Sequence, residues 1–208
     1  TILNVNEGVA MTPTMVLFLL FFATASGVVI IAVDPGDPDV MHRPPRDPAV
    51  PITNRPAVIG WVVYAAVLFV AAFVPLVAGP DEPSPDSASA SMTMTFAVMG
   101  LGTVFNALTN RRDPTSGLTA PVVKALAIGL VPVAMVFLAT QLPSLQSALL
   151  TVPLTGGQWL TCIGLAALLP VTIELGKVVR RRARRMPSAP SPQAVVAPAR
   201  GRTDPAAS

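Results

Sequence analysis

The stretch DPGDPDVMHRPPRDP, residues 34–48, is polar and proline-rich, and it separates two long apolar runs. A non-helical, proline-rich backbone is not stable in hydrocarbon, because its polar groups find no hydrogen-bond partner there. The runs on either side are long enough and apolar enough to cross a bilayer. The stretch therefore predicts a short loop that joins two membrane helices on one side of a membrane.

The composition of the whole chain agrees with a multi-pass membrane protein. Apolar residues make up 52% of the 208 residues and charged residues only 12%, whereas soluble domains carry about 25% charged residues. The mean hydropathy is +0.63. At about 20 residues per helical crossing, the chain has room for about five crossings and for no large soluble domain.

Other features of the composition concern the origin of the chain. It begins with Thr1 and has no basic segment before its first apolar run, so that run does not resemble a signal peptide, and we interpret the chain as a fragment. Lysine is scarce, while alanine, valine, proline and arginine are abundant, which indicates a bacterial protein. The single cysteine, Cys162, excludes a disulfide framework.

Continuous apolar runs predict membrane helices rather than alternating strands. Together they predict an all-α polytopic bundle, with a membrane domain over residues 1–186 and a disordered cytoplasmic tail over residues 187–208, which are rich in proline, serine and alanine. The third run contains threonine, glycine and asparagine, so we expect it inside the bundle, where polar side chains find partners. The runs cover residues 8–33, 57–79, 92–108, 122–142 and 159–175.

Small residues and prolines within the runs predict local features of the helices. Ala23 with Gly27 and Ala125 with Gly129 have the four-residue spacing that lets helices approach closely. Prolines inside an apolar run predict kinks or local unwinding, and they are Pro13, Pro132 and Pro170.

The distribution of lysine and arginine predicts the orientation. Basic residues occur in the loop after the first run, in the loop after the third and directly after the fifth, whereas residues 80–91 and 143–158 contain none. Basic loops remain in the cytoplasm. We therefore expect a multi-pass protein of the plasma membrane with its N-terminal end outside and its C-terminal tail in the cytoplasm.

Three segments together resemble the C-terminal transmembrane region of type II P-type cation-transporting ATPases, the calcium-pump-like family. FNALTNRRD, residues 105–113, resembles the end of their eighth membrane helix, and residues 153–182 resemble their last helix. The loop after the first run resembles the loop after their sixth helix, and the residues that carry this match are Asp34, Pro35, Asp37, Asp39, Met41, Arg43, Pro44, Pro45 and Arg46. The resemblance implies a bundle like helices six to ten of these pumps.

The resemblance also implies candidates for a cation pathway. LNVNEG, residues 3–8, resembles an element of the fifth helix and places Asn4 and Glu7 on polar residues of the family. In the family, Glu7 would belong to the fifth helix and the first loop would follow the sixth, but the residues between them are too few for two helices. Either the chain derives from an internally deleted pump, or the match at Glu7 is a coincidence. The resemblance places the family's ligand positions of the sixth helix on Leu20, Ala23 and Thr24, and that of the eighth helix on Thr103. Neutral oxygens in this region come from Thr24, Ser26, Thr103 and Asn106, and ordinary hydrogen bonding between helices is the alternative role for them.

We predict no metal site, cofactor or catalytic residue. The usual carboxylate ligands of a hard cation are missing at the matched positions, and the only histidine, His42, lies in the polar loop without a pattern suited to zinc. The chain also lacks the phosphorylation motif and the nucleotide-binding domain of a P-type pump, so we expect it not to be an enzyme on its own.

The expected function is therefore that of a membrane module that supports the ion-translocation pathway of a cation pump. The alternatives are a stand-alone small subunit that binds a full-length pump or another membrane complex, and a pump remnant without function. The expected partners are the lipid bilayer and either the catalytic portion of a P-type ATPase or another membrane protein. Nucleic acid is not expected, because the basic run at residues 180–185 directly follows a membrane span.

Overall fold

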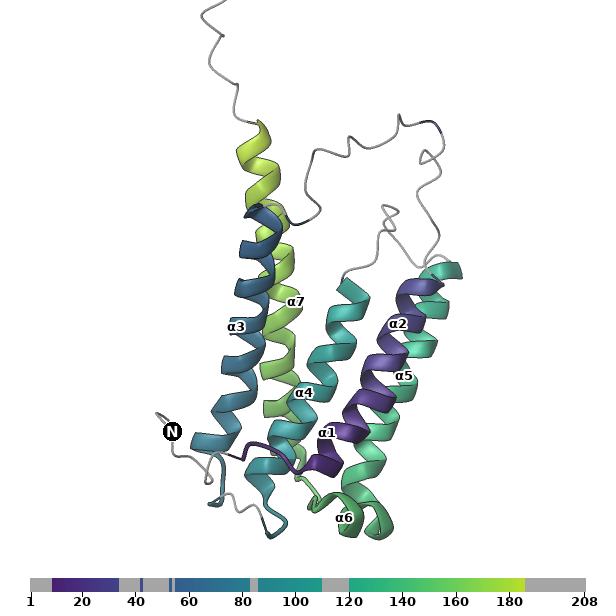
Figure 1. The fold of residues 1–208 in the computed structure, drawn as a ribbon, viewed down its shortest axis with the longest axis vertical. Helices are drawn as coiled ribbons and strands as arrows, with labels where there is room; N and C mark the ends of the chain where they lie inside the picture. The colour runs from purple at the N-terminus through teal and green to yellow at the C-terminus, as the bar shows by residue number, and fades with distance from the viewer. Residues whose placement is uncertain are drawn as a thin grey trace, which may run out of the picture. The chain divides into compact units, whose positions relative to one another are not determined.

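The structure, a computed structural model, describes residues 9–33, 42, 53, 55–82, 86–109 and 120–185. Within these residues the fold is helical and contains no strand. Five of its helical segments are long and apolar enough to cross a membrane (Figure 1). The predicted all-helical fold with five membrane spans is thereby confirmed. The predicted tail at residues 187–208 lies outside the described residues.

The first membrane segment is a continuous helix with a wider turn in its middle. It consists of α1 (Pro13–Leu19), the π-helical turn η2 (Leu20–Thr24) and α2 (Ala25–Ala32). The Thr12 side chain accepts a hydrogen bond from the backbone N–H of Met15 and caps the helix. Pro13 therefore starts the helix rather than kinking it, because a proline in the first turn removes no helical hydrogen bond.

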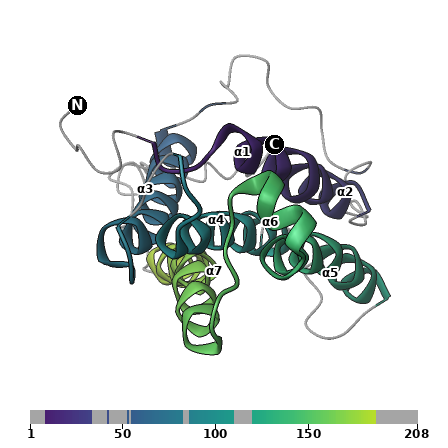
Figure 2. The same ribbon diagram turned by 90° about the horizontal axis from the view of Figure 1, so that it is seen from below.

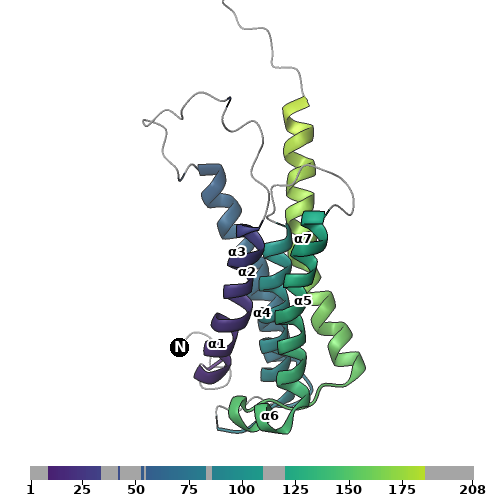
Figure 3. The same ribbon diagram turned by 90° about the vertical axis from the view of Figure 1, so that its right-hand side faces the viewer.

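The remaining helices follow in chain order. They are α3 (Arg55–Ala78), α4 (Ala90–Thr109), α5 (Ala120–Gln141), α6 (Pro143–Leu149) and α7 (Gly156–Arg185). The short helix α6 lies in a stretch that the sequence predicted as a loop. It begins with Pro143 and ends at Leu149, and the next residue, Leu150, has a φ of 56°, which lies in the left-handed region. Figure 3 shows α6 at one end of the bundle, turned across the direction of the long helices.

Helix α4 occupies the centre of the bundle. In its membrane span 67% of residues are buried, compared with 17–28% in the other four spans. Figure 2 shows α4 between α3 and α5. Its mean hydropathy of 1.3 is also the lowest of the five spans. The expectation that the third apolar run lies inside the bundle is confirmed, since most of this span is buried, with Thr93, Thr95 and Gly100 among the buried residues.

Glycines on α4 allow neighbouring helices to approach closely. A Cβ atom added at Gly100 would lie 2.7 Å from a methyl group of Val136 on α5, and one at Gly102 would lie 2.8 Å from a methyl group of Leu68 on α3. Both distances are shorter than a normal carbon–carbon contact. Each glycine therefore provides the space that a side chain of a neighbouring helix fills.

The predicted small-residue pairs also lie at helix contacts. Ala23 and Ala125 are almost completely buried. A Cβ atom on Gly27 would touch Ala107 of α4 at 3.5 Å. A Cβ atom on Gly129 would touch Val104 of α4 at 3.4 Å. These contacts join the first membrane segment and α5 to the central helix.

The chain divides into two compact units, residues Thr1–Glu174 and Leu175–Ser208. The first unit contains the helices described above and α7 as far as Glu174. Within it, Cys162 and Ala166 of α7 belong to the same buried apolar cluster as Phe96 and Val98 of α4. In the second unit, α7 continues as a helix to Arg185.

Candidate functional site

The structure places three of the predicted pathway residues, and all three are neutral. Thr24 is the last residue of η2 and is exposed. Thr103 and Asn106 are half-buried on successive turns of α4. The Thr103 hydroxyl donates to the backbone carbonyl of Met99 at 2.8 Å. The fold thus brings Thr103 and Asn106 near each other on the central helix, while Thr24 lies on the surface of another segment.

The other predicted site residues cannot be located in this fold. Asn4 and Glu7 lie outside the described residues, and so do the loop positions that carry the family resemblance. The loop positions concerned are Asp34, Pro35, Asp37, Asp39, Met41, Arg43, Pro44, Pro45 and Arg46. Their proposed roles stay predictions.

Within the described part of the chain, no group of three His, Cys, Asp or Glu residues could hold a metal ion. A hard divalent cation such as Ca²⁺ takes about six to eight oxygen ligands. The side chains of Thr24, Thr103 and Asn106 supply only three oxygens, all of them uncharged. These three side chains by themselves therefore fall short of what such an ion requires.

One side chain of α4 and one of α7 each make a hydrogen bond to another helix. The Thr95 hydroxyl, which is buried, lies 3.1 Å from the carbonyl oxygen of Ala72 on α3 and 3.0 Å from that of Ser91. On another side of α4, the Cys162 thiol of α7 lies 3.7 Å from the carbonyl oxygen of Met94. A thiol is a weak donor. These contacts link α4 to α3 and to α7, and the sequence analysis did not single out Thr95 for this role.

A third link joins α4 to the connection between α6 and α7. The backbone N–H of Val152 donates to the Thr93 hydroxyl at 3.1 Å, and that hydroxyl donates to the carbonyl oxygen of Ser89 at 2.7 Å. The two residues of this connection that flank Val152 differ in exposure, since Thr151 is buried and Pro153 is exposed. The central helix is thus held by polar contacts at its first turn as well as by apolar packing.

The beginning of α4 is capped by two side chains. The Asp81 carboxylate accepts hydrogen bonds from the backbone N–H groups of Ala90 at 2.7 Å and Ser91 at 2.8 Å. The Ser91 hydroxyl lies 2.7 Å from the Asp81 carboxylate. Ser89 accepts from the backbone N–H of Met92 at 3.1 Å. The backbone N–H groups of the first turn, which have no acceptor within the helix, are thereby hydrogen-bonded, and this fixes where α4 starts.

These contacts also set the ionisation of Asp81, which lies outside the membrane spans. Partial burial on its own would raise the pKa of this carboxyl. Hydrogen bonds from the Ser91 hydroxyl and from the backbone N–H groups of Ala90 and Ser91 act in the opposite direction and hold the pKa below its usual value. Asp81 is therefore an ionised cap at the N-terminus of α4, where the helix dipole also favours a negative charge.

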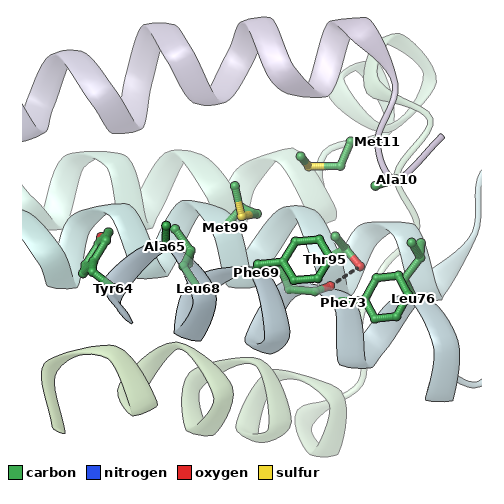
Figure 4. A pocket seen from close by; sticks show the side chains of 11 residues that line it. Ala10, Met11, Tyr64, Ala65, Leu68, Phe69, Phe73, Leu76, Thr95 and Met99 are labelled. Carbon is green, nitrogen blue, oxygen red and sulfur yellow. Dashed lines mark hydrogen bonds between the residues drawn. The ribbon is translucent and has the colours of Figure 1, made fainter. Parts of the chain in front are cut away.

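An apolar cavity of about 340 Å³ opens between α3, α4 and the segment before α1 (Figure 4). Phe69 and Phe73 of α3 line it together with Met99 of α4 and Met11. The hydroxyl of Thr95 reaches its wall, but this hydroxyl is engaged by the Ala72 carbonyl. The lining suits an apolar occupant, because a cation there would meet almost no oxygen ligand.

A bundle of five potential membrane helices, packed around a central helix with hydroxyl-mediated links, defines a multi-pass membrane protein. A family model described as the C-terminus of cation transporting ATPases matches residues 8–179. The chain belongs to this family, which confirms the resemblance to the C-terminal transmembrane region of P-type ATPases. A comparison with curated proteins found no match.

Proposed function

We propose that the chain supports the ion-translocation pathway of a cation-transporting P-type ATPase and does not hydrolyse ATP by itself. The observation that carries this proposal is the family match over residues 8–179. The bundle supports it, because the polar groups of α4 described above connect helices to one another. A module of this kind stabilises neighbouring helices in a fixed arrangement while other parts of a pump perform the reaction.

The hydrogen bonds that link the helices of the bundle are individually weak, and close packing adds to them. Hydrogen bonds between membrane helices contribute about 0.6 kcal/mol each on average, so the contacts of Thr95 and Cys162 are modest individually. Close packing at Gly100 and Gly102 adds to them, because side chains from α5 and α3 fill the space next to each glycine. Together these contacts hold three helices against α4.

The candidate pathway residues belong to the same proposal. Thr103 and Asn106 are half-buried on α4, so they could face a pathway only where another helix of the complete pump covers them. Thr24 is exposed on the first membrane segment, so it too would face a pathway only beneath a helix of the complete pump. Asn4 and Glu7 remain candidates on the resemblance alone. We further propose that the N-terminal end is outside the plasma membrane and that the tail is cytoplasmic, as the charge distribution predicts.

An enzymatic assay tests the central proposal. The chain, purified and reconstituted in lipid vesicles, should show no cation-dependent ATP hydrolysis and no acid-stable phosphoenzyme. A complete P-type cation pump in the same vesicles serves as the positive control. Vanadate-sensitive turnover by the chain alone would contradict the proposal, since it would require a phosphorylation site within these residues.

A stand-alone subunit is the alternative that the structure favours next. Large apolar side chains on α3 are exposed, among them Trp61, Phe69 and Val77, and in a membrane such a face contacts either lipid or another helix. Recovery of a full-length ATPase with the tagged chain, from cells in which both are separate products, would favour the subunit. A remnant without function predicts instead that deleting the chain leaves cation-dependent growth unchanged.

A further inference from the structure

The apolar cavity beside α3 follows one face of that helix. Its lining on α3 includes Tyr64, Leu68, Ala72 and Leu76, and residues four apart lie on the same face of a helix. Figure 4 shows Tyr64, Leu68 and Leu76 in this order along α3. The rise from Tyr64 to Leu76 is about 18 Å at 1.5 Å per residue. The cavity is therefore elongated along α3, and we call it the α3 groove.

The α3 groove lies within a membrane span and is open along one side. All of its residues on α3 belong to the span Val58–Ala78. Leu76 and Thr95 in its wall are buried, whereas Ala65 and Phe69, which also line it, are exposed. In a membrane the open side therefore faces the hydrocarbon chains of lipid.

We propose that the α3 groove binds one acyl chain of a membrane phospholipid, with the headgroup at the Leu76 end. None of the described residues that line the groove is charged. The Thr95 hydroxyl is already engaged by the Ala72 carbonyl oxygen at 3.1 Å, so a polar occupant would give up hydrogen bonds to water for few new ones. Met11 and Met99 suit a flexible chain, because the unbranched methionine side chain adapts its shape. This inference does not depend on the proposed role in an ATPase.

The dimensions of the groove favour a single chain over a helix. Its volume of about 340 Å³, spread over a length of about 18 Å, gives a mean cross-section of roughly 19 Å². An α-helix with its side chains is about 10–12 Å wide and has a cross-section of roughly 80–110 Å². An acyl chain crosses one leaflet, about 15 Å of hydrocarbon, which is close to the length of the groove.

The position of the groove along α3 sets the direction of the chain. Leu76 lies about 3 Å from the end of the span at Ala78, whereas Tyr64 lies about 9 Å from its other end at Val58. The groove thus approaches a membrane surface only at the Leu76 end. Because the glycerol and the headgroup stay in the interfacial region, the ester end of the chain lies near Leu76 and the terminal methyl near Tyr64.

Site-resolved photolabelling tests the proposal. The full chain is reconstituted in phosphatidylcholine vesicles with a small share of phosphatidylcholine that carries a diazirine near the terminal methyl of one acyl chain. After irradiation, mass spectrometry measures the labelling of each residue. Bulk lipid labels according to exposure and would favour Leu130 of α5, which is 65% exposed. A bound chain should instead label the half-buried Tyr64 more strongly than Leu130.

A second probe tests the direction of the chain. With the diazirine close to the glycerol, the half-buried Met11 should be labelled more strongly than Leu160 of α7, which is 73% exposed. Both comparisons use the parent protein, so they do not depend on the folding of a variant.

Matched variants separate the groove from the rest of α3. Ala65→Phe adds a ring at an exposed position that lines the groove. It should lower the labelling of Tyr64 by at least about fivefold, which corresponds to about 1 kcal/mol, the lower end of the cost of overpacking. Ala66→Phe makes the same change at the next residue, which is exposed and does not line the groove, and should leave the labelling unchanged.

Four results would overturn the proposal. They are labelling of the parent protein that follows exposure, an unchanged labelling of Tyr64 in Ala65→Phe, an equal loss in Ala66→Phe, and a glycerol-side probe that labels Tyr64 instead of Met11. A disulfide between two copies of the Cys162→Ser, Phe69→Cys variant in the same vesicles would also overturn it, because a second copy of the chain would then cover the groove.

Discussion

Replacing Asp81 with alanine should destabilise the junction between α3 and α4. The Asp81 carboxylate accepts the backbone N–H groups of Ala90 and Ser91 at 2.7 and 2.8 Å and also contacts the Ser91 hydroxyl. Alanine removes all of these contacts and leaves donors of the first turn of α4 to water. Because α4 is the central helix, a looser first turn weakens the contacts of every helix that packs on it.

The expected magnitude follows from the capping geometry. Loss of a side-chain cap costs about 0.5–2 kcal/mol, and loss of a negative charge at a helix N-terminus costs about 0.3–1 kcal/mol when exposed. Asp81 is exposed, so we expect a total of about 1–2 kcal/mol. For a chain of this size such a loss lowers Tm by about 2–8 °C.

The effect should depend on pH in a defined direction. The pKa of Asp81 is lower in the folded protein than its usual value, so the ionised carboxylate stabilises the fold. This contribution is complete above the unfolded pKa of about 3.9 and is lost as pH falls through the lower folded pKa. The Tm difference between the parent protein and Asp81→Ala should therefore be constant from about pH 7 to pH 5 and shrink below about pH 4.

Thermal unfolding in detergent micelles, followed by circular dichroism, measures both effects. Asp86→Ala provides the matched control, because Asp86 is an exposed carboxylate in the same connection and its replacement changes the net charge equally. Asp81→Asn, which keeps an acceptor oxygen without the charge, should lie between the parent and Asp81→Ala. The capping argument is refuted if Asp81→Ala and Asp86→Ala have the same Tm, or if the difference already disappears near pH 6.

Three further predictions follow from the same fold. Thr95→Val removes the hydroxyl contact with the Ala72 carbonyl and should cost about 0.6 kcal/mol, up to about 1.7, measured as a lower Tm. Gly79→Ala places a methyl group against the Pro75 carbonyl oxygen and a side chain of α4 and should cost about 1–3 kcal/mol. A cysteine at residue 84 should react with an impermeant thiol reagent from outside, and one at residue 115 only from the cytoplasm.

Controls for these experiments come from the same chain. Thr161→Val changes an exposed threonine of α7 whose hydroxyl bonds within its own helix, so its Tm should change less than that of Thr95→Val. Gly164→Ala has open space around the added Cβ and should not reproduce the loss at Gly79. Labelling uses a Cys162→Ser background, and the reverse labelling pattern at residues 84 and 115 would overturn the orientation.

The amino-acid sequence by itself was sufficient to predict the helical class, the five crossings and the family. The contrast between the polar loop at residues 34–48 and its apolar neighbours can be read without knowing any contact. In a bilayer the backbone must satisfy its hydrogen bonds within a helix or a closed barrel, so long apolar runs leave few alternatives. The polar composition of the third run also predicted its central position, which its burial confirms.

The contacts within the bundle were decided only by the tertiary structure. The bond from Thr95 to Ala72 spans 23 residues of sequence, and the one from Cys162 to Met94 spans 68. Such pairs depend on how each helix is rotated about its axis, and the apolar runs encode this rotation weakly because almost every face of a lipid-exposed helix is apolar. The cap from Asp81, the short helix α6 and the cavity beside α3 were missed for the same reason: each depends on which surfaces meet after the helices pack.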